Sequence, residues 1–385
     1  MLLQGSEIIA IAQPPPFVER VSELPDFKPT LSLTIAEAVL DAAFLYEGVE
    51  SEVALEALSK IVFAAQGCTA RAWGRCLRAA PSAGATYPLR TYVVARAVRG
   101  LEPGVYSYQS PAPLKHALRR VEGISVSSRG SFAILFEEVS ERTTGVYGER
   151  GYMYIREEVG HAAQGALLEA SALGLAGRLR KLEPPLGRIR YCVEICARGA
   201  KLIERRPPKG FAEPSPAKLT LEEAIVHRRS VRKYSPMPLR LDELSSILLW
   251  SISGPVRPYQ PLTSYRVTCY LAARSIKGLD PGVYRYSPEE HELENIVKGD
   301  VSARLAAAAL GQEWVARAPL NIVLCTPSDS PDAELEAGMV GQNIYLSATS
   351  LGLGTVAVGA FYDDDVASVL RVDERPLYIF PVGRP

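Results

Sequence analysis

Three arginines and a serine lie close together in the motif Arg228-Arg229-Ser230-Val231-Arg232, at the end of a predicted helix. Guanidinium groups bind phosphate through paired hydrogen bonds, and the Ser230 hydroxyl adds another donor. The motif therefore suggests a phosphate site. The other interpretation is a solvated basic helix end, because cations at a helix C-terminus complement the helix dipole.

A second motif is rich in small residues and reads PSAGATYP from Pro81 to Pro88. Small side chains allow a flat ligand to approach the backbone, where peptide N–H groups and the Ser82 hydroxyl are donors. An ordinary Gly/Pro turn is the alternative. Two weaker signals are the strand end Val358-Gly359-Ala360 and the C-terminal Gly383-Arg384-Pro385.

The elements that must position these motifs occur twice in the chain. The segment GLEPGVYSY begins at Gly100, and GLDPGVYRY begins 178 positions later, at Gly278. Further matches at the same separation make a chance repeat untenable. These matches relate Glu158, Gly160 and Gln164 to Glu336, Gly338 and Gln342.

The repeat predicts two similar halves. We place an N-terminal extension at 1–30, a first half at 31–204, a proline-rich linker at 205–217 and a second half at 218–385. Four prolines in the linker are incompatible with a helix or a central strand. Hydrophobic spacing predicts helices at 34–45, 220–229, 241–251 and 332–351, and strands at 91–95, 267–272, 355–358 and 376–382. The mixture indicates an α+β fold.

Composition excludes several classes of function. Lys plus Arg and Asp plus Glu both number 43, so the net charge is zero, which argues against nucleic acid as a ligand. The six cysteines form no CxxC pair and there are only four histidines, so we predict no metal site. The cysteine usage and the lack of a signal-peptide pattern favour a reducing, cytoplasmic location.

One stretch, from Ala337 to Tyr362, contains no charged residue and is long enough to span a bilayer. It carries polar side chains, including Gln342 and Asn343, together with several glycines. We therefore predict a buried helix followed by a buried strand, and no membrane association.

Together these motifs resemble those of the nitroreductase superfamily of flavin enzymes, and within it the SagB-type dehydrogenase branch. The resemblance runs from about residue 30 to the C-terminus. It rests on RRSVRKYS at 228–235, APSAGATYP at 80–88, both GL(E/D)PGVY segments, GQEWVARAP at 311–319, AGMVGQNIYLSATSLGLG at 337–354, VGAFYDD at 358–364 and PLYIFPVGRP at 376–385. It implies two nitroreductase-like halves that form an intrachain pseudo-dimer, with FMN at their interface.

A symmetric pseudo-dimer would have two flavin sites, but each half keeps only part of one. By alignment, the small-residue motif faces 259–263 in the second half, and the arginine motif faces 42–46 in the first. Gly359 likewise faces Leu182. In the family, the arginine motif and the glycine strand come from one subunit and the small-residue motif from the other. We therefore predict one FMN per chain, with no need of a second chain.

The resemblance assigns roles to individual residues. Arg228 and Ser230 would hold the phosphate and ribityl chain, and Arg232 would lie near flavin N1 and the C2 carbonyl. The Gly359 N–H would approach flavin N5, and Arg384 would add to the phosphate site. The cofactor-binding residues predicted in this way are Pro81, Ser82, Ala83, Gly84, Ala85, Arg228, Arg229, Ser230, Arg232, Gln342, Asn343, Val358, Gly359, Ala360 and Arg384. Asn343 suits a structural hydrogen bond between helices equally well.

Substrate chemistry has fewer candidates. Tyr147 matches a position where azoline-oxidising relatives carry a Lys-Tyr pair, but Val146 replaces the lysine, which disfavours azoline oxidation. Tyr147 could still donate a proton. His161 is more typical of a core histidine than of a catalytic one.

We therefore expect an FMN-dependent oxidoreductase that transfers hydride through N5 to a small-molecule or peptide substrate. NAD(P)H could bind transiently as the reductant. The alternative is a non-catalytic flavin-binding or scaffold partner of a peptide-modifying complex.

Overall fold

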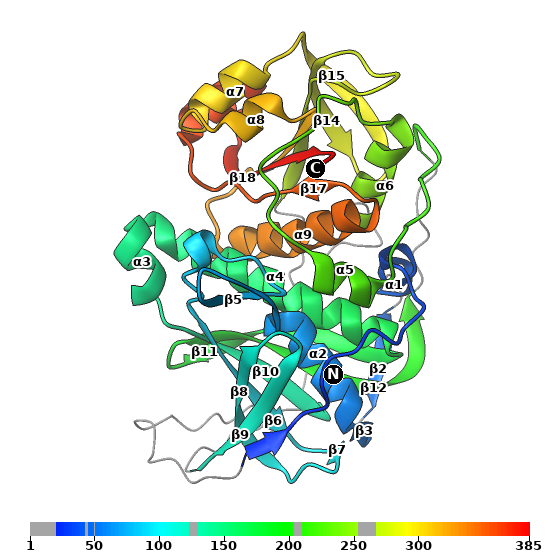
Figure 1. The fold of residues 1–385 in the computed structure, drawn as a ribbon, viewed down its shortest axis with the longest axis vertical. Helices are drawn as coiled ribbons and strands as arrows, with labels where there is room; N and C mark the ends of the chain where they lie inside the picture. The colour runs from blue at the N-terminus through cyan, green and yellow to red at the C-terminus, as the bar shows by residue number, and fades with distance from the viewer. Residues whose placement is uncertain (1–20, 43–44, 50, 123–129, 204–209, 253–266) are drawn as a thin grey trace.

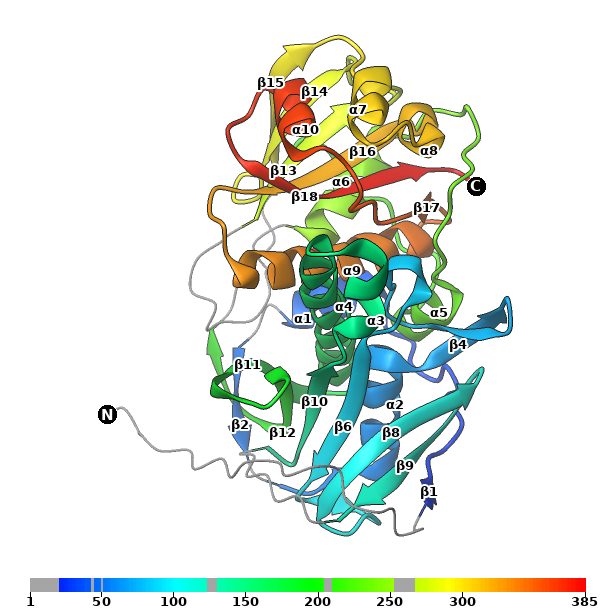
Figure 2. The same cartoon turned by 90° about the vertical axis from the view of Figure 1, so that its left-hand side faces the viewer.

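The computed structural model describes residues 21–42, 45–49, 51–122, 130–203, 210–252 and 267–385. Two α+β halves are stacked, with one sheet at each end of the molecule and a layer of helices between them (Figures 1 and 2). This arrangement confirms the two-half α+β fold expected from the repeat. The helices of the middle layer come from both halves, so they form the interface.

The first half is built on an eight-stranded sheet with the order β1-β9-β8-β6-β10-β12-β11, and β2 pairs with β12. Its strands are β1 (Val21–Glu23), β2 (Leu45–Val49), β6 (Leu89–Ala95), β8 (Gly104–Ala112), β9 (Lys115–Val121), β10 (Phe132–Glu138), β11 (Leu175–Leu186) and β12 (Ile189–Ile203). Two short pairs lie outside it: β3 (Val53–Ala54) with β7 (Val98–Arg99), and β4 (Cys68–Ala72) with β5 (Arg75–Arg78). Its helices are α1 (Ile35–Ala42), α2 (Leu55–Gln66), α3 (Glu141–Tyr147) and α4 (Arg150–Ala172).

The second half has a six-stranded antiparallel sheet with the order β15-β14-β13-β16-β18-β17. Its strands are β13 (Thr268–Ala273), β14 (Gly282–Ser287), β15 (Glu292–Lys298), β16 (Leu320–Thr326), β17 (Gly354–Thr355) and β18 (Arg375–Gly383). Its helices are α5 (Leu221–His227), α6 (Leu241–Ser251), α7 (Ser302–Ala308), α8 (Glu313–Arg317), α9 (Pro331–Ser350) and α10 (Asp363–Leu370).

The two halves meet where α4 crosses α9. A Cβ atom added to Gly160 would lie 2.1 Å from the Leu335 carbonyl oxygen, and one added to Gly338 would lie 2.0 Å from that of Glu157. These two glycines are related by the sequence repeat, and their lack of side chains allows the backbones to touch. The Gln164 amide also donates to the Asn343 side chain at 3.0 Å. The crossing therefore confirms that repeat-related residues pack against each other.

In each half, a buried histidine contacts the chain segment that precedes that half in the sequence. The two histidines make the same kinds of contact. In the first half, the buried His116 ring contacts Ser59 Oγ at 3.0 Å and Tyr108 Oη at 2.9 Å. The His116 carbonyl accepts a hydrogen bond from the backbone of Leu24, and the Phe27 ring stacks on Phe63 beside the imidazole.

In the second half, His291 contacts Ser245 Oγ at 2.8 Å and Tyr286 Oη at 2.7 Å. Its carbonyl accepts from the backbone of Phe211, whose ring stacks on the imidazole. Burial lowers the pKa of both imidazoles, and that of His291 falls to about 4, so both rings are neutral at pH 7. The segment around Phe211 thus makes the contacts of the segment around Phe27, although the sequence suggested only a linker.

Most predicted elements are present. Thr220 caps α5 through a reciprocal pair of hydrogen bonds with Glu223, and α6 has the predicted bounds. The helix predicted at 34–45 is shorter, because the chain enters strand β2 at Leu45. The uncharged stretch forms α9, followed by β17, and no helix in the described ranges is long and apolar enough to cross a membrane.

One expectation about the cysteines differs from the structure. Cys68 and Cys76 form a disulfide with Cα atoms 5.4 Å apart, whereas a reducing compartment would keep both as thiols. The bond joins β4 to β5, which form a hairpin that projects beside α2 in Figure 2. The two cysteines are 8 positions apart in the sequence, and the hairpin brings them together.

Candidate active site

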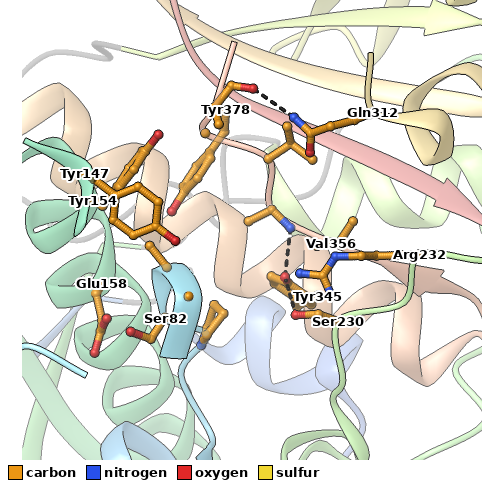
Figure 3. A pocket seen from close by; sticks show the side chains of 17 residues that line it. Ser82, Tyr147, Tyr154, Glu158, Ser230, Arg232, Gln312, Tyr345, Val356 and Tyr378 are labelled. Carbon is orange, nitrogen blue, oxygen red and sulfur yellow. Dashed lines mark hydrogen bonds between the residues drawn. The ribbon is translucent and has the colours of Figure 1, made fainter. Parts of the chain in front are cut away.

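A cavity of about 160 Å³ lies between the two halves. A single water needs roughly 10–15 Å³ on this scale, so the space suits a ligand of many atoms. Figure 3 shows residues of the first half on one side of it and residues of the second half on the other. The lining consists of Pro81, Ser82, Ala83, Gly84, Tyr147, Tyr154, Glu158, Ser230, Arg232, Gln312, Tyr345, Val356, Ala357, Val358, Gly359, Ala360 and Tyr378.

The small-residue motif forms one wall. A 3₁₀ turn at Ala83–Ala85 turns the chain, and Gly84 adopts the left-handed φ of 56° that favours glycine. Ser82 Oγ accepts a hydrogen bond from the Tyr87 backbone at 3.0 Å. Thr86 Oγ1 lies 2.7 Å from Thr143 Oγ1, so the turn is tied to α3.

Two tyrosines from α3 and α4 reach toward the two glycines of the site. A Cβ atom on Gly84 would lie 2.5 Å from Tyr147 Oη, and a Cβ atom on Gly359 would lie 2.5 Å from Tyr154 Cε1. The tyrosine rings meet edge to face, with centroids 5.1 Å apart. Burial raises the pKa of Tyr154 to about 12, so its hydroxyl stays protonated at neutral pH. Both glycines are therefore needed for the tyrosines to fit.

A buried carboxyl group also lines this wall. Glu158 in α4 is 3% exposed, and its Oε1 has no hydrogen-bond partner. Burial raises the pKa of Glu158 to about 8, although Ser82, Arg78 and Gln66 act to lower it. The side chain is therefore mostly neutral at pH 7 and can donate a proton. Figure 3 shows Glu158 beside Ser82.

The opposite wall is held together by Tyr345 of α9. Its hydroxyl accepts a hydrogen bond from the Ala357 backbone at 2.8 Å and lies 3.1 Å from Ser230 Oγ. The Arg232 guanidinium lies 5.6 Å from the centroid of the Trp314 ring and lines the cavity. Ser230, Arg232 and the strand end thus form one surface (Figure 3).

The glycine strand end is bound from both halves. Arg150 Nε of α4 donates to the Gly359 carbonyl at 2.8 Å, and the same guanidinium pairs with Asp363. The Gln312 amide donates to the Ala360 carbonyl at 2.8 Å. Val358 pairs with Ile379 of β18 through two backbone hydrogen bonds. These bonds fix the backbone of 358–360 along the cavity.

The structure places the first two arginines of the motif outside the lining. Arg228 is 4% exposed and donates to the carbonyls of Arg78 and Ala79, while its guanidinium lies over the Tyr345 ring. Its Nη1 is buried without a hydrogen-bond partner. Arg229 donates to Thr69 in the β4–β5 hairpin. Both arginines therefore connect the second half to the first.

Other predicted cofactor residues also have protein partners. Arg384 pairs with Glu243 at 2.7 Å. The Gln342 amide donates to the Ala79 carbonyl at 3.4 Å, and Asn343 accepts from Gln164, which is the structural alternative considered for it. Ala85 belongs to the turn but does not line the cavity.

Several residues of the site carry no functional signal in the sequence motifs. Tyr154, Tyr345 and Tyr378 follow helical or strand spacing and look like core residues. Glu158 was noticed only as a member of the repeat. A carboxylate within an apolar helix is a usable signal, because such groups are rarely buried without a role or a partner. The other unassigned lining residues are Gln312, Val356 and Ala357.

His161 lies in the core beside the cavity. It is 1% exposed and packs near the rings of Tyr345 and Tyr378. Burial and the charge of Arg228 lower the pKa of His161 to about 3, so the ring is neutral at pH 7. It does not line the cavity.

The sequence matches the Nitroreductase family model twice, at residues 49–179 and 225–384. The chain belongs to the nitroreductase family. The two matches lie in the two halves of the fold, so the chain is a nitroreductase-family tandem protein. Family members commonly bind FMN, and the family relationship indicates oxidoreductase activity.

Individual relatives agree with this assignment. A protein of Methanocaldococcus jannaschii described as a nitroreductase is 38% identical over 186 residues, which are 44% of this chain and 94% of that protein. One nitroreductase of that kind therefore corresponds to about half of this chain. A protein of Methanothermobacter thermautotrophicus named NADH dehydrogenase/NAD(P)H nitroreductase is 26% identical over 170 residues, or 43% of this chain and 74% of that protein.

A solved structure shares the fold over both halves. It is a nitroreductase-like protein from Anabaena variabilis, with a TM-score of 0.72 and 23% sequence identity. The match covers 97% of this chain and 94% of that one. The tandem nitroreductase fold is thus a known arrangement.

Proposed function

We propose that this tandem nitroreductase is an FMN-dependent oxidoreductase with one composite flavin site per chain. The observation that supports it is the cavity between the halves. The small-residue wall of the first half faces Ser230, Arg232 and Gly359 of the second half across it. The two motifs that the sequence analysis treated as complementary thus meet at one place.

The residues present fit FMN. Hydroxyl and guanidinium donors from Ser230 and Arg232 line one side of the cavity. The small residues at 81–84 form part of the other side, beside Tyr147 and Tyr154. Arg228 keeps one buried N–H group that makes no hydrogen bond to protein, as a donor to an anionic ligand would. Arg232 would face the flavin N1 and C2 carbonyl.

Bound FMN supplies a two-electron carrier that accepts and returns hydride at N5. The positive charge of Arg232 would stabilise the negative charge that reduction adds at N1. The fixed backbone of 358–360 would orient the reacting edge. Tyr147 and Tyr154 line the cavity on the α3–α4 side, where their hydroxyl groups would be available to a bound ligand.

NAD(P)H is the proposed transient reductant, as the name of the Methanothermobacter relative would suggest. The acceptor is a small molecule or a peptide. Membership of the SagB-type branch and a cytoplasmic location remain part of this proposal. The replacement of the family lysine by Val146 argues against azoline oxidation.

Visible absorbance of the purified protein, with flavin quantified after denaturation, tests the cofactor and its stoichiometry. We expect about one FMN per chain. Reduction by NAD(P)H is then followed by the loss of flavin absorbance, with quinones and nitroaromatics as acceptors. Two FMN per chain would contradict the single composite site.

A second candidate is a non-catalytic flavin-binding or scaffold partner in a peptide-modifying complex. It is favoured by the engagement of Arg228, Arg229 and Arg384 with protein groups, which leaves fewer cations for a phosphate. A colourless protein that fails to bind added FMN would support this candidate.

A further inference from the structure

Glu158 is the buried acid of the cavity. Among the described residues that line the cavity, it is the only carboxylic acid, and the remaining lining is apolar, hydroxyl-bearing, amide or cationic. Its equivalent in the repeat, Glu336, is also buried but does not line the cavity. The two halves therefore differ in which of these carboxyl groups can reach a ligand.

The surroundings of Glu158 come from four elements. Ser82 of the small-residue turn and Gln66 at the end of α2 face its carboxyl group with hydrogen-bonding side chains. Arg78 of β5 and Arg142 of α3 act on it as charges. The charge of Glu158 in turn acts to raise the pKa of Tyr87, which follows the small-residue turn.

Arg78 and Ser82 also bind other groups. Arg78 Nη1 donates to the Gln66 backbone and side-chain oxygens at 3.2 Å, and its guanidinium lies over the Tyr87 ring at 5.2 Å. Ser82 Oγ already accepts from the Tyr87 backbone. Glu158 therefore has cations nearby but forms no ion pair within the described ranges, and its Oε1 has no hydrogen-bond partner. This is an environment that keeps a carboxylic acid protonated yet reachable from the cavity.

We propose that Glu158 is a catalytic acid, whose carboxyl group gives a proton to an acceptor that is reduced in the cavity. The inference rests on the proposed flavin-dependent reduction. The acceptor takes a hydride and the Glu158 proton, so it gains two electrons and two hydrogens. In a quinone the hydride goes to one carbonyl oxygen and the proton to the other, and the product is the hydroquinone. The two electrons come from NAD(P)H by way of the cofactor, and the carboxylate regains its proton from water.

The structure also explains why Tyr154 and Tyr378 are poorer proton donors than Glu158. The pKa of Tyr154 is raised to about 12, and that of Tyr378 is raised well above its usual value by burial and by Glu157. An acid works best when its pKa lies near the operating pH. Glu158, with its pKa near 8, meets this condition better than either tyrosine.

The test separates the two half-reactions in stopped-flow experiments on the FMN-loaded protein. Transfer of hydride from NAD(P)H to the cofactor needs no acid, whereas reduction of a quinone does. For Glu158→Gln we expect unchanged FMN affinity and unchanged reduction by NAD(P)H. Quinone reduction should slow by roughly 100-fold, within the range for loss of a general acid.

The pH profile provides a second readout. The wild-type rate of quinone reduction should fall as pH rises through about 8, the pKa of Glu158, and the Glu158→Gln rate should not depend on pH there. Infrared spectroscopy should detect a protonated carboxyl group at pH 7 that is lost in Glu158→Gln. Glu336→Gln is the matched control, because it removes the repeat-related buried carboxyl group and should behave as wild type.

The outcomes are distinguishable. If wild-type protein binds no FMN or is not reduced by NAD(P)H, the proposed function fails and this proposal falls with it. If wild type is active and Glu158→Gln reduces quinone at the wild-type rate, only the role of Glu158 is wrong. Equal slowing of both half-reactions, or of Glu336→Gln as well, would reveal a structural role and would also overturn the proposal.

Discussion

The two halves of this protein are alike where they fold and unlike where they meet a ligand. Each half keeps a Ser–His–Tyr trio, around His116 or His291, that contacts the chain segment preceding that half. The helix crossing uses repeat-related glycines, Gly160 and Gly338. The two walls of the cavity, by contrast, are made of different residues from each half.

This difference shows which residues a duplicated chain must keep in both halves and which it needs only once. Packing and buried polar groups must be satisfied in each half separately, so their residues occur twice. A composite site needs each wall only once, so the second copy of each wall is free to change. Comparing the two halves of this one sequence therefore separates residues that maintain the fold, which occur in both halves, from residues that line the cavity, which differ between the halves.

The largest effect should follow from filling the helix crossing. Gly160→Leu places a side chain where even a Cβ atom would lie 2.1 Å from a backbone oxygen, so α4 and α9 must separate. We expect a loss of more than about 3 kcal/mol in the free energy of unfolding, above the usual cost of overpacking, or failure to fold. Chemical denaturation measures it. Gly174→Leu is unsuitable as a control because its φ is 73°, whereas Gly145→Ala meets no atom within 4 Å and should be tolerated.

Removing the histidine from either Ser–His–Tyr trio should destabilise the protein by a similar amount. His116→Ala and His291→Ala each remove a buried ring together with its hydrogen bonds to a serine and a tyrosine hydroxyl. We expect each to cost about 3 kcal/mol of unfolding free energy, with FMN stoichiometry unchanged in the protein that folds. If only one of the two substitutions lowered the free energy of unfolding, the two trios would not be equivalent.

His161 in α4 and its repeat-related residue, Met339 in α9, differ in type. The effect of pH on stability therefore tests a position at which the two halves differ. The pKa of His161 is about 3 in the folded protein, below its usual 6.5, so the unfolded chain binds more protons between these values. Its contribution to stability is present above pH 6.5 and is lost as pH falls toward 3.

Relative to His161→Gln, the wild type should lose about 2 kcal/mol between pH 7 and pH 5, from 1.36 kcal/mol per pKa unit. Paired denaturation curves at the two pH values measure this difference. Parallel behaviour of the two proteins would show that the ring is accessible to protons in the folded state.

The smallest effect on stability should come from the cavity wall. Arg232→Ala removes a cation of the proposed flavin site that is exposed and makes no ion pair in the described part of the chain. We expect FMN affinity to fall about tenfold, or about 1.4 kcal/mol, with the melting temperature of the FMN-free protein unchanged. Lys233→Ala removes the neighbouring exposed cation and serves as the control. Fluorescence titration with FMN distinguishes them.

Much of the architecture was predictable from local signals. The cap at Thr220, helix α6 and the buried α9 follow from patterns within about twenty residues. The repeat predicted two similar halves, and the family resemblance implied that they would form a pseudo-dimer. The two motifs rich in arginine and in small residues contributed Ser230, Arg232 and 81–84 to one cavity.

The partners of the charged groups were not predictable in this way. Arg228 and Arg229 suggested a phosphate site, yet their donors meet backbone carbonyls and Thr69 in the other half, about 150 residues away in sequence. The disulfide between Cys68 and Cys76 needed the β4–β5 hairpin, which carries only a weak sequence signal.

The sequence was sufficient to predict a duplicated α+β chain, and it supports the proposal that each half contributes part of one flavin site. These properties depend on periodicity, capping and repetition, which are written in neighbouring residues. Only the tertiary structure decided which wall faces which and which carboxyl group lies in the cavity. Glu158 and Glu336 are related by the repeat and both are buried, but of the two only Glu158 lines the cavity, because access to the cavity depends on packing between distant segments.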